Sequence, residues 1–230
     1  ALSVLLLAGF VQRQRTSEFP VLPLGIVLDR DRGAAFLGIL VAGSGMFGAF
    51  LFVTYYLQSV LGYTPMQTGA AFMPMVVAII ITAQLQTNLL VPRLGPKLLV
   101  PIGMALGAAG MLSFTVLDGT STYPHLLPGL ILLGMGMGSI MPASFQISTL
   151  GVAPDQAGAA SAAVSTSQQV GGALGTAVLN TLATTATASY LAAHDATNPA
   201  DQLAAAPHGF STAYLWAAGI FLAGLVVTAL

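Results

Sequence analysis

Apolar residues run along this chain in blocks long enough for a membrane span, which takes about 20 helical residues. Short breaks rich in Gly and Pro separate the blocks. We therefore expect complete spans at about Phe36–Gln58, Met66–Leu90, Leu98–Leu117, His125–Leu150, Gly158–Ser189 and Gly209–Leu230. The runs do not alternate between apolar and polar residues, and each is about twice as long as a barrel strand. The pattern predicts an all-α membrane protein.

The segments before the first complete span predict a different organisation. The run over residues 1–11 is too short to cross a bilayer, so we expect it to be the end of a preceding transmembrane helix. Residues 12–35 are expected to form a cytoplasmic basic loop, in which the proline-interrupted stretch Val21–Leu28 lies along the interface. Residues 36–230 are expected to form one six-helix bundle. The sequence also stops inside an apolar stretch, so we interpret it as a fragment of a longer protein.

Charge is scarce and confined to the breaks between spans. Only 6% of residues are charged, against about a quarter in a soluble domain. The bases fall in two segments, Arg13 to Arg32 and Arg93 to Lys97. Two spans separate these segments, so both are expected on one side, which the positive-inside rule makes cytoplasmic. We expect a multi-pass protein of the cytoplasmic membrane with both ends of the six-span block inside. The many Ala residues and the single Lys favour a bacterial origin.

Composition also argues against several function classes. The chain has no Cys, which removes disulfides, thiolate metal sites and cysteine nucleophiles. His125, His194 and His208 lie far apart and near span ends, so no metal site is expected. The spans offer serines but no acid, histidine or lysine at membrane depth, which argues against an intramembrane enzyme. With a net charge of -1, nothing points to a nucleic-acid partner. No cofactor is expected.

Several glycine pairs are spaced for close helix packing, because small residues let backbones approach in a membrane. We single out Gly134 with Gly138 and Gly171 with Gly175. Such pairs are either static contacts or sliding contacts between helices that rock, and spacing alone does not separate these two interpretations.

The fifth complete span carries a polar stripe. Ser161, Ser165, Gln168 and the glycines that follow recur at intervals of three and four residues, and Gln169 flanks them. Polar groups in hydrocarbon need partners, so this stripe must face the bundle interior or an aqueous cavity. Gln168 and Gln169 are then either hydrogen-bonding links between helices or the wall of a solute pathway.

Other spans offer further candidate pathway residues. In the fourth, Gln146 lies near Met137 and Met141, whose side chains suit a pocket for varied apolar solutes and are equally ordinary core fillers. Tyr55 and Gln58 stand at the outer end of the first span, where tyrosines are also common interface anchors.

Longer stretches resemble a known family. These are Phe47-Gly-Ala-Phe-Leu-Phe-Val-Thr-Tyr-Tyr-Leu-Gln58, Val60-Leu-Gly-Tyr-Thr-Pro-Met-Gln-Thr-Gly69, Leu127-Pro-Gly-Leu-Ile-Leu-Leu-Gly-Met-Gly-Met-Gly138 and Ser165-Thr-Ser-Gln-Gln-Val-Gly-Gly-Ala-Leu-Gly175. They are similar to the C-terminal half of a major facilitator superfamily transporter, in its fourteen-span drug:proton antiporter branch of the EmrB/QacA type. The resemblance implies that the fold is the six-helix C-terminal bundle of that superfamily.

The resemblance implies a proton-driven exporter of small lipophilic or cationic solutes. Its partners would be the lipid bilayer and the missing N-terminal half, which in the family carries the best-known proton-coupling acid. The family's gating loop motif survives here as Arg93, Gly95 and Lys97, with Asn88 and Pro92 in place of its glycine and aspartate. The alternative is a truncated or noncatalytic membrane protein that acts as a structural partner.

Overall fold

The computed structural model describes residues 9, 12–14, 25, 29–194 and 198–229. In this part of the chain every regular element is a helix, so the all-α prediction is confirmed. The elements are α3 (Arg30–Tyr55), η1 (Tyr56–Val60), α4 (Pro65–Ala71), α5 (Met73–Leu85), η2 (Gln86–Leu90), α6 (Val91–Leu94), α7 (Pro96–Phe114), α8 (Tyr123–Thr149), η3 (Pro154–Gln156), α9 (Ala157–Ala193) and α10 (Pro199–Ala229). Except for residues 9 and 25, the expected preceding helix end and the interfacial stretch Val21–Leu28 lie outside the described residues.

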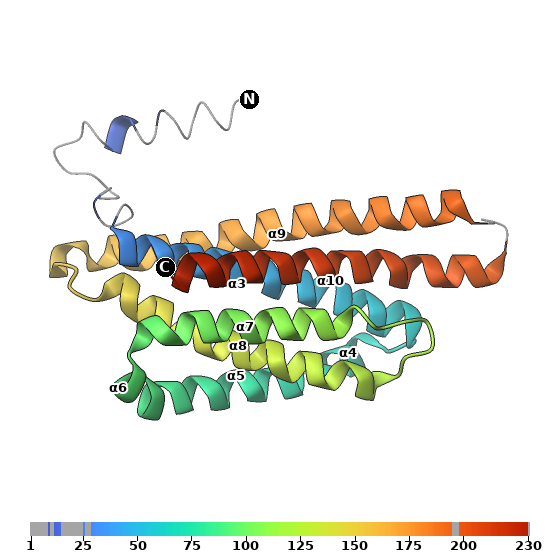
Figure 1. The fold of residues 1–230 in the computed structure, drawn as a ribbon, viewed down its shortest axis with the longest axis horizontal. Helices are drawn as coiled ribbons and strands as arrows, with labels where there is room; N and C mark the ends of the chain where they lie inside the picture. Colours follow the sequence, from blue (N-terminus) through green and yellow to red (C-terminus); the bar gives the residue numbers. More distant parts are fainter. Residues whose placement is uncertain (1–8, 10–11, 15–24, 26–28, 195–197, 230) are drawn as a thin grey trace.

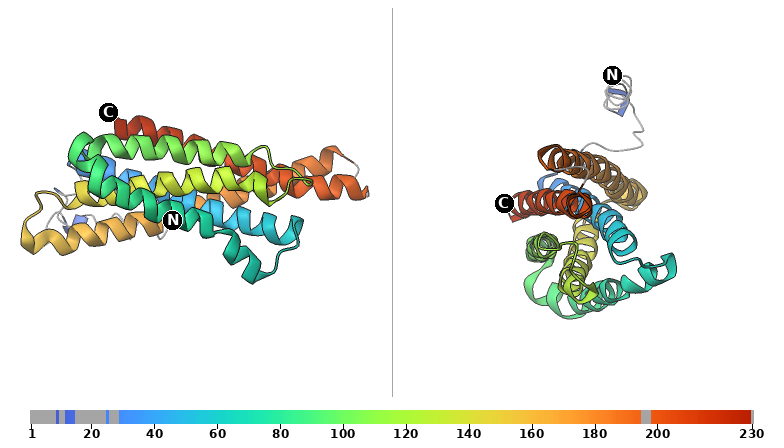
Figure 2. Two further views of the ribbon diagram at one scale, coloured as in Figure 1. Left: turned by 90° about the horizontal axis from the view of Figure 1, so that it is seen from below. Right: turned by 90° about the vertical axis from the view of Figure 1, so that its right-hand side faces the viewer.

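The long helices lie side by side with their axes along the length of the molecule (Figure 1). Helix α3 packs against α8, α9 and α10, while α7 lies between α8 and α10. Helix α5 packs on α8. An end-on view places α5 and α9 on opposite sides of the bundle (Figure 2). The two outlying helices therefore each have a flank that the other long helices do not cover.

Among the residues that the structure describes, five helical segments are long and apolar enough to span a membrane: Arg30–Val60, Pro65–Leu94, Pro96–Phe114, Tyr123–Thr149 and Ala204–Ala229. They coincide with five of the six expected spans. The sixth, α9, is 37 residues long and packs alongside α3 and α10. Its serines, threonines and glutamines leave it below the apolar level of the others. By its overall composition α9 is less suited to face lipid than the five candidate spans, although Val170, Leu174 and Val178 on it are exposed.

Helix ends differ most from the expected bounds at two places. Helix α3 begins at Arg30, because the carboxylate of Asp29 accepts a 3.0 Å hydrogen bond from the amide of Arg32 and caps the first turn. Helix α10 begins at Pro199 within a stretch expected to be loop, where Ala204–Ala206 favour helix. Both helices therefore extend beyond their apolar stretches, α3 because Asp29 caps it and α10 because its first turns contain alanines.

Two π-helical turns end the first two spans. Turn η1 follows α3 and turn η2 follows α5, and each contains one extra residue per turn. The second span is also divided at Phe72, where Pro74 occupies the first turn of α5. Proline is tolerated there because the first amides of a helix have no partner within it.

Aromatic side chains fill the core where α3, α7 and α10 meet. The ring of Tyr214 lies 5.1 Å from that of Phe114 and 6.0 Å from that of Phe52, between ring centroids. The Phe221 ring occupies the space beside Gly45 and Gly107. Glycine at these two positions lets a large ring lie between the helices.

Candidate solute pathway and gating end

The predicted packing glycines lie at helix crossings. Gly171 faces the main chain of Leu40, and Gly175 faces Ser44, so both bring α9 onto α3. A Cβ atom on Gly134 would lie 2.5 Å from the carbonyl oxygen of Met75, and one on Gly138 would lie 2.6 Å from that of Ile79. No side chain fits at these distances, so α8 approaches α5, and α9 approaches α3, backbone to backbone.

The α9 glutamines lie beside this close contact. The main-chain oxygen of Gln168 lies against α3, where a Cβ on Gly43 would come within 2.6 Å of it. Gln168 is half-buried, whereas Gln169 and Ser165 are exposed on the flank that α3 leaves uncovered. Within the described residues, none of these three side chains makes a hydrogen bond. Both amide groups therefore remain available to a ligand or to another protein surface.

The α8 candidates separate into different environments. Gln146 is exposed and Met141 is half-buried, but Met137 is only 2% exposed and belongs to the apolar core. Its neighbours in the sequence, Gly136 and Gly138, draw α7 and α5 close, and this encloses the Met137 side chain. In this arrangement Met137 packs as a core residue and has no exposed route to a solute.

The two candidates of the first span lie at the end of that span, Tyr55 as the last residue of α3 and Gln58 on η1. Tyr55 is 44% exposed and stacks on Phe210 of α10 at 6.3 Å between ring centroids. Gln58 is exposed on η1. The candidates on α3, α8 and α9 thus lie along much of the bundle, and in the described residues no side-chain hydrogen bond joins any two of them.

The residues expected to form a gating loop, Arg93, Gly95 and Lys97, lie at the end of the bundle where α3 begins, here called the basic end. Lys97 Nζ lies 2.6 Å from Oδ2 of Asp31, which joins the first turns of α3 and α7. Both side chains are more than half exposed, at 68% and 55%, so solvent screens the pair and its contribution to stability is small, about 0.2–1 kcal/mol. Arg93 is exposed at the end of α6.

Two local features position this pair. Gly95 has φ 75° and ψ 157°, a conformation available in practice to glycine alone, and it turns the chain from α6 into α7. Arg32 donates a 3.1 Å hydrogen bond to the carbonyl oxygen of Leu150 and so caps the last turn of α8 with a cation. The start of α3 is thereby tied to both α7 and α8.

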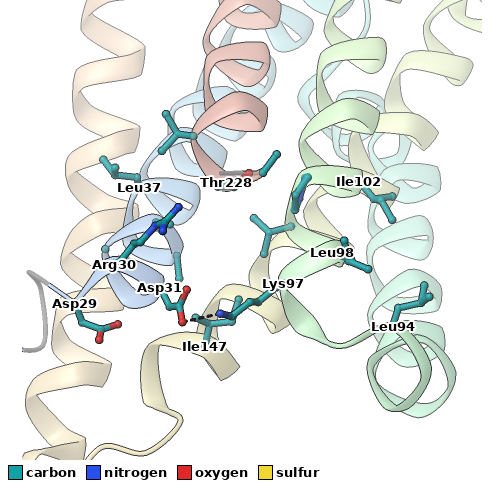
Figure 3. A pocket seen from close by; sticks show the side chains of 17 residues that line it. Asp29, Arg30, Asp31, Leu37, Leu94, Lys97, Leu98, Ile102, Ile147 and Thr228 are labelled. Atoms are coloured by element: carbon teal, nitrogen blue, oxygen red, sulfur yellow. Dashed lines mark hydrogen bonds and ion pairs between the residues drawn. The ribbon is translucent and has the colours of Figure 1, made fainter.

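A cleft of about 890 Å³ opens beside the ion pair, between the start of α3, the start of α7 and the end of α10 (Figure 3). Its rim carries Asp29, Arg30, Asp31 and Lys97, and its wall is apolar. None of the eight candidate pathway residues lines it.

Two polar side chains near span ends link elements, and the sequence did not predict their partners. Gln86 is fully buried in η2 and donates a 2.7 Å hydrogen bond to the carbonyl oxygen of Ser139 in α8. At the opposite end, the Tyr56 hydroxyl donates to the carbonyl oxygens of Asp118 and Ser121, at 2.5 and 3.0 Å. In the sequence, a glutamine or tyrosine within an apolar span indicates that its side chain needs a hydrogen-bond partner. It does not indicate which residue that partner is.

The loop that Tyr56 binds is itself ordered around a carboxylate. Oδ1 of Asp118 accepts hydrogen bonds from the hydroxyl and amide of Thr120, at 2.7 and 2.8 Å, and from the hydroxyl of Ser121 at 3.0 Å. These bonds, those from Thr120 first, lower the pKa of Asp118 to about 2. Asp118 is therefore charged throughout the physiological range.

Comparison with known proteins connects this arrangement to transport. The sequence profile of the Major Facilitator Superfamily matches residues 6–176. The chain is 44% identical over 224 residues to the puromycin resistance protein pur8 of Streptomyces alboniger, covering 96% of this chain and 44% of that protein.

Two further relatives are more distant. An uncharacterized MFS-type transporter, EfpA of Mycobacterium tuberculosis, is 34% identical over 219 residues, covering 92% of this chain and 40% of the relative. The tetracenomycin C resistance and export protein of Streptomyces glaucescens is 30% identical over 182 residues, covering 79% of this chain and 34% of the relative. The chain spans less than half the length of each of these three proteins.

Proposed function

Because this chain belongs to the major facilitator superfamily of membrane transporters, we propose that it forms the C-terminal six-helix half of a drug exporter of the EmrB/QacA type. Two of the relatives are named for antibiotic resistance, and one of these also for export. Each is more than twice as long as its match to this chain, and the remainder would supply the N-terminal half.

The uncovered polar flank of α9 carries this proposal. Helix α9 is less apolar than the five candidate spans. Its Gln168, Gln169 and Ser165 side chains make no hydrogen bond within the described residues. If the two glutamines were links between helices of this bundle, their amides would be bonded to α3, α8 or α10. A solute cavity, wet and shared with the N-terminal half, supplies the missing partners.

Solute selection follows from the chemistry of this flank. Amide and hydroxyl groups on α9, with the exposed Gln146 of α8 and the partly buried Met141, offer neutral polar and polarisable contacts. Such contacts suit lipophilic or cationic solutes of varied shape better than anions. Puromycin and tetracenomycin C, taken from the names of the relatives, are the first solutes to test.

The energy source we propose is the inward proton gradient, with no cofactor. The charges in the described residues lie near helix ends, as with Asp31 and Lys97, or in loops, as with Asp118. Each described span is free of an acid or base near its centre. The titrating group of the exporter is then expected in the N-terminal half. The present chain would contribute the C-terminal half of the central cavity, and the two halves would rock against each other.

The orientation we propose places the basic end in the cytoplasm of a bacterial cell, in line with the positive-inside rule. Both ends of the six-helix bundle would then lie inside. The pair of Asp31 and Lys97 would hold the inner ends of α3 and α7 together while the two halves exchange access from one side to the other.

Export by the full-length protein tests the proposal. Expressed in a bacterial strain that lacks its own efflux pumps, the protein should lower cellular accumulation of puromycin or a lipophilic cationic dye. A protonophore should abolish the effect while ATP remains present. Unchanged accumulation across a broad panel, at verified membrane abundance, would contradict an export function and favour a structural role.

A further inference from the structure

We propose that the cleft at the basic end binds one membrane phospholipid whose headgroup carries both a phosphate and a primary ammonium, as in phosphatidylethanolamine. The cleft lies between α3, α7 and α10 (Figure 3). Helices α7 and α10 carry none of the candidate pathway residues. The site is therefore separate from the proposed solute pathway, and its occupant is bound rather than transported.

The wall of the cleft is suited to an acyl chain. Leu37, Leu98 and Ile102 line it and remain 49%, 56% and 46% exposed. Val227 at the end of α10 lines the same space and is 43% exposed. These side chains lie on helices long and apolar enough to span a membrane, near the helix ends that form the cleft. A lipid whose headgroup reached the charged rim would therefore place its tail against them. Burying this surface against a tail removes it from water.

The rim of the cleft carries charges of both signs. Asp29 and Asp31 supply two carboxylates, while Arg30 and Lys97 supply two cations. A site for a simple anion would not place two carboxylates at its mouth, and a site for a simple cation would not place two bases there. A headgroup with a phosphate and an ammonium a few bonds apart matches both signs together.

The ion pair leaves hydrogen-bonding capacity for such a headgroup. Lys97 has three ammonium hydrogens, and the short contact with Oδ2 of Asp31 uses one. Oδ1 of Asp31 accepts no hydrogen bond from the described residues. We infer that the lipid ammonium donates to Asp31 while the phosphate accepts from Lys97, which would join α3 and α7 through the lipid as well as directly.

Headgroup chemistry provides the test. The full-length protein is purified in detergent and incubated with phosphatidylethanolamine, phosphatidylcholine or phosphatidylglycerol of identical acyl chains, and retained lipid is counted by native mass spectrometry. Phosphatidylethanolamine should be retained about fivefold more than phosphatidylcholine, whose ammonium has no hydrogen to donate. A preference for phosphatidylglycerol would overturn the zwitterion assignment. No retained lipid of any kind would overturn the proposal that the cleft is a lipid site.

Variants locate the site. Asp31→Asn should remove the preference for phosphatidylethanolamine, and Leu98→Trp, which fills the wall, should lower retention of all three lipids. Lys97→Gln should weaken lipid retention, whereas Arg93→Gln removes a charge at the same end outside the cleft and should leave lipid retention unchanged.

Each variant must stay monodisperse in size-exclusion chromatography, and Lys97→Arg should retain binding. Equal lipid retention by folded Asp31→Asn and Leu98→Trp proteins would overturn the proposal. Because binding is read without transport, a protein that retains lipid but exports nothing contradicts the export function alone.

Discussion

The side-chain amide of Gln86 donates a 2.7 Å hydrogen bond to the main-chain oxygen of Ser139, within the contact between α5 and α8. Gln86 is the first residue of the π-helical turn η2, and Ser139 lies one turn before Pro142 in α8. The bond joins the irregular end of one span to the proline-containing part of another. It fixes the position of η2 at the end of α5, from which the chain leads into α6 and the loop at Gly95.

Replacing Gln86 should destabilise the protein. Gln86→Ala removes a buried hydrogen bond and leaves a cavity, so we expect the free energy of unfolding to fall by about 1–3 kcal/mol. Thermal unfolding of the purified protein in detergent measures this change. Gln84→Ala, at an exposed position of the same span, should shift stability by no more than about 0.5 kcal/mol. Equal losses in the two variants would show that the buried bond contributes nothing.

A methyl group on Gly171 should disrupt the contact between α9 and α3. Its Cβ would meet the main chain of Leu40, which cannot move aside as a flexible side chain would. We expect Gly171→Ala to cost about 1–3 kcal/mol of stability, measured by the same thermal unfolding. Gly158 on the same helix has open space around it. Gly158→Ala should therefore be neutral or stabilising, and a comparable loss there would point to helix-wide effects.

In the full-length protein, the export function proposed above predicts that the α9 amides influence solute choice. We expect Gln168→Ala and Gln169→Ala to change efflux of some members of a dye and antibiotic panel severalfold while leaving others unaffected, because different solutes use different polar contacts. Thr212→Ala on α10 removes a hydroxyl that bonds within its own helix and serves as a control. A flat response across the panel at equal membrane abundance would remove both glutamines from the pathway.

A pH titration of the Asp118 carboxyl tests the hydrogen bonds that order its loop. Its pKa in the folded protein, about 2, lies below the ordinary value of 3.8. The stabilising effect of its charge is therefore complete above pH 3.8 and is lost as the pH falls toward 2. A ¹³C NMR titration of the Asp118 carboxyl should report the low midpoint. Thr120→Val removes the hydroxyl donor and should raise this pKa, and a midpoint near 3.8 in the parent protein would refute the hydrogen-bonded loop.

Sequence patterns predicted the helices well, because span length and apolar content are local properties. The glycine spacing likewise indicated where α9 and α8 could approach another helix. It did not identify Leu40 or Met75 as the opposing backbones, since these contacts depend on how the helices cross. The early start of α3 was missed because Asp29 to Arg32 were expected to form part of a loop, whereas Asp29 caps the helix.

The site was harder to predict. Asp31 and Lys97 are 66 residues apart, and exposed charges carry no signal of which partner they bind. Met137 and Met141 are one helical turn apart in the same span, yet one lies in the core and the other at its edge. Gln169, which flanks the polar stripe of α9, is exposed, whereas Gln168 on the stripe is half-buried. Whether such a side chain packs in the core or can reach a solute depends on its burial. Its burial in turn depends on which helices pack beside it.

The polarity of α9 has a consequence for how the protein is made. A nascent helix with this content of serine, threonine and glutamine has little tendency to leave the translocon for lipid by itself. Helix α3 is already in the bilayer when α9 emerges from the ribosome, but α10 is not. We expect α9 to be held by α3 through the Gly171 and Gly175 contact until α10 completes its surroundings. Biogenesis of this bundle thus depends on the same backbone contact that shapes its folded state.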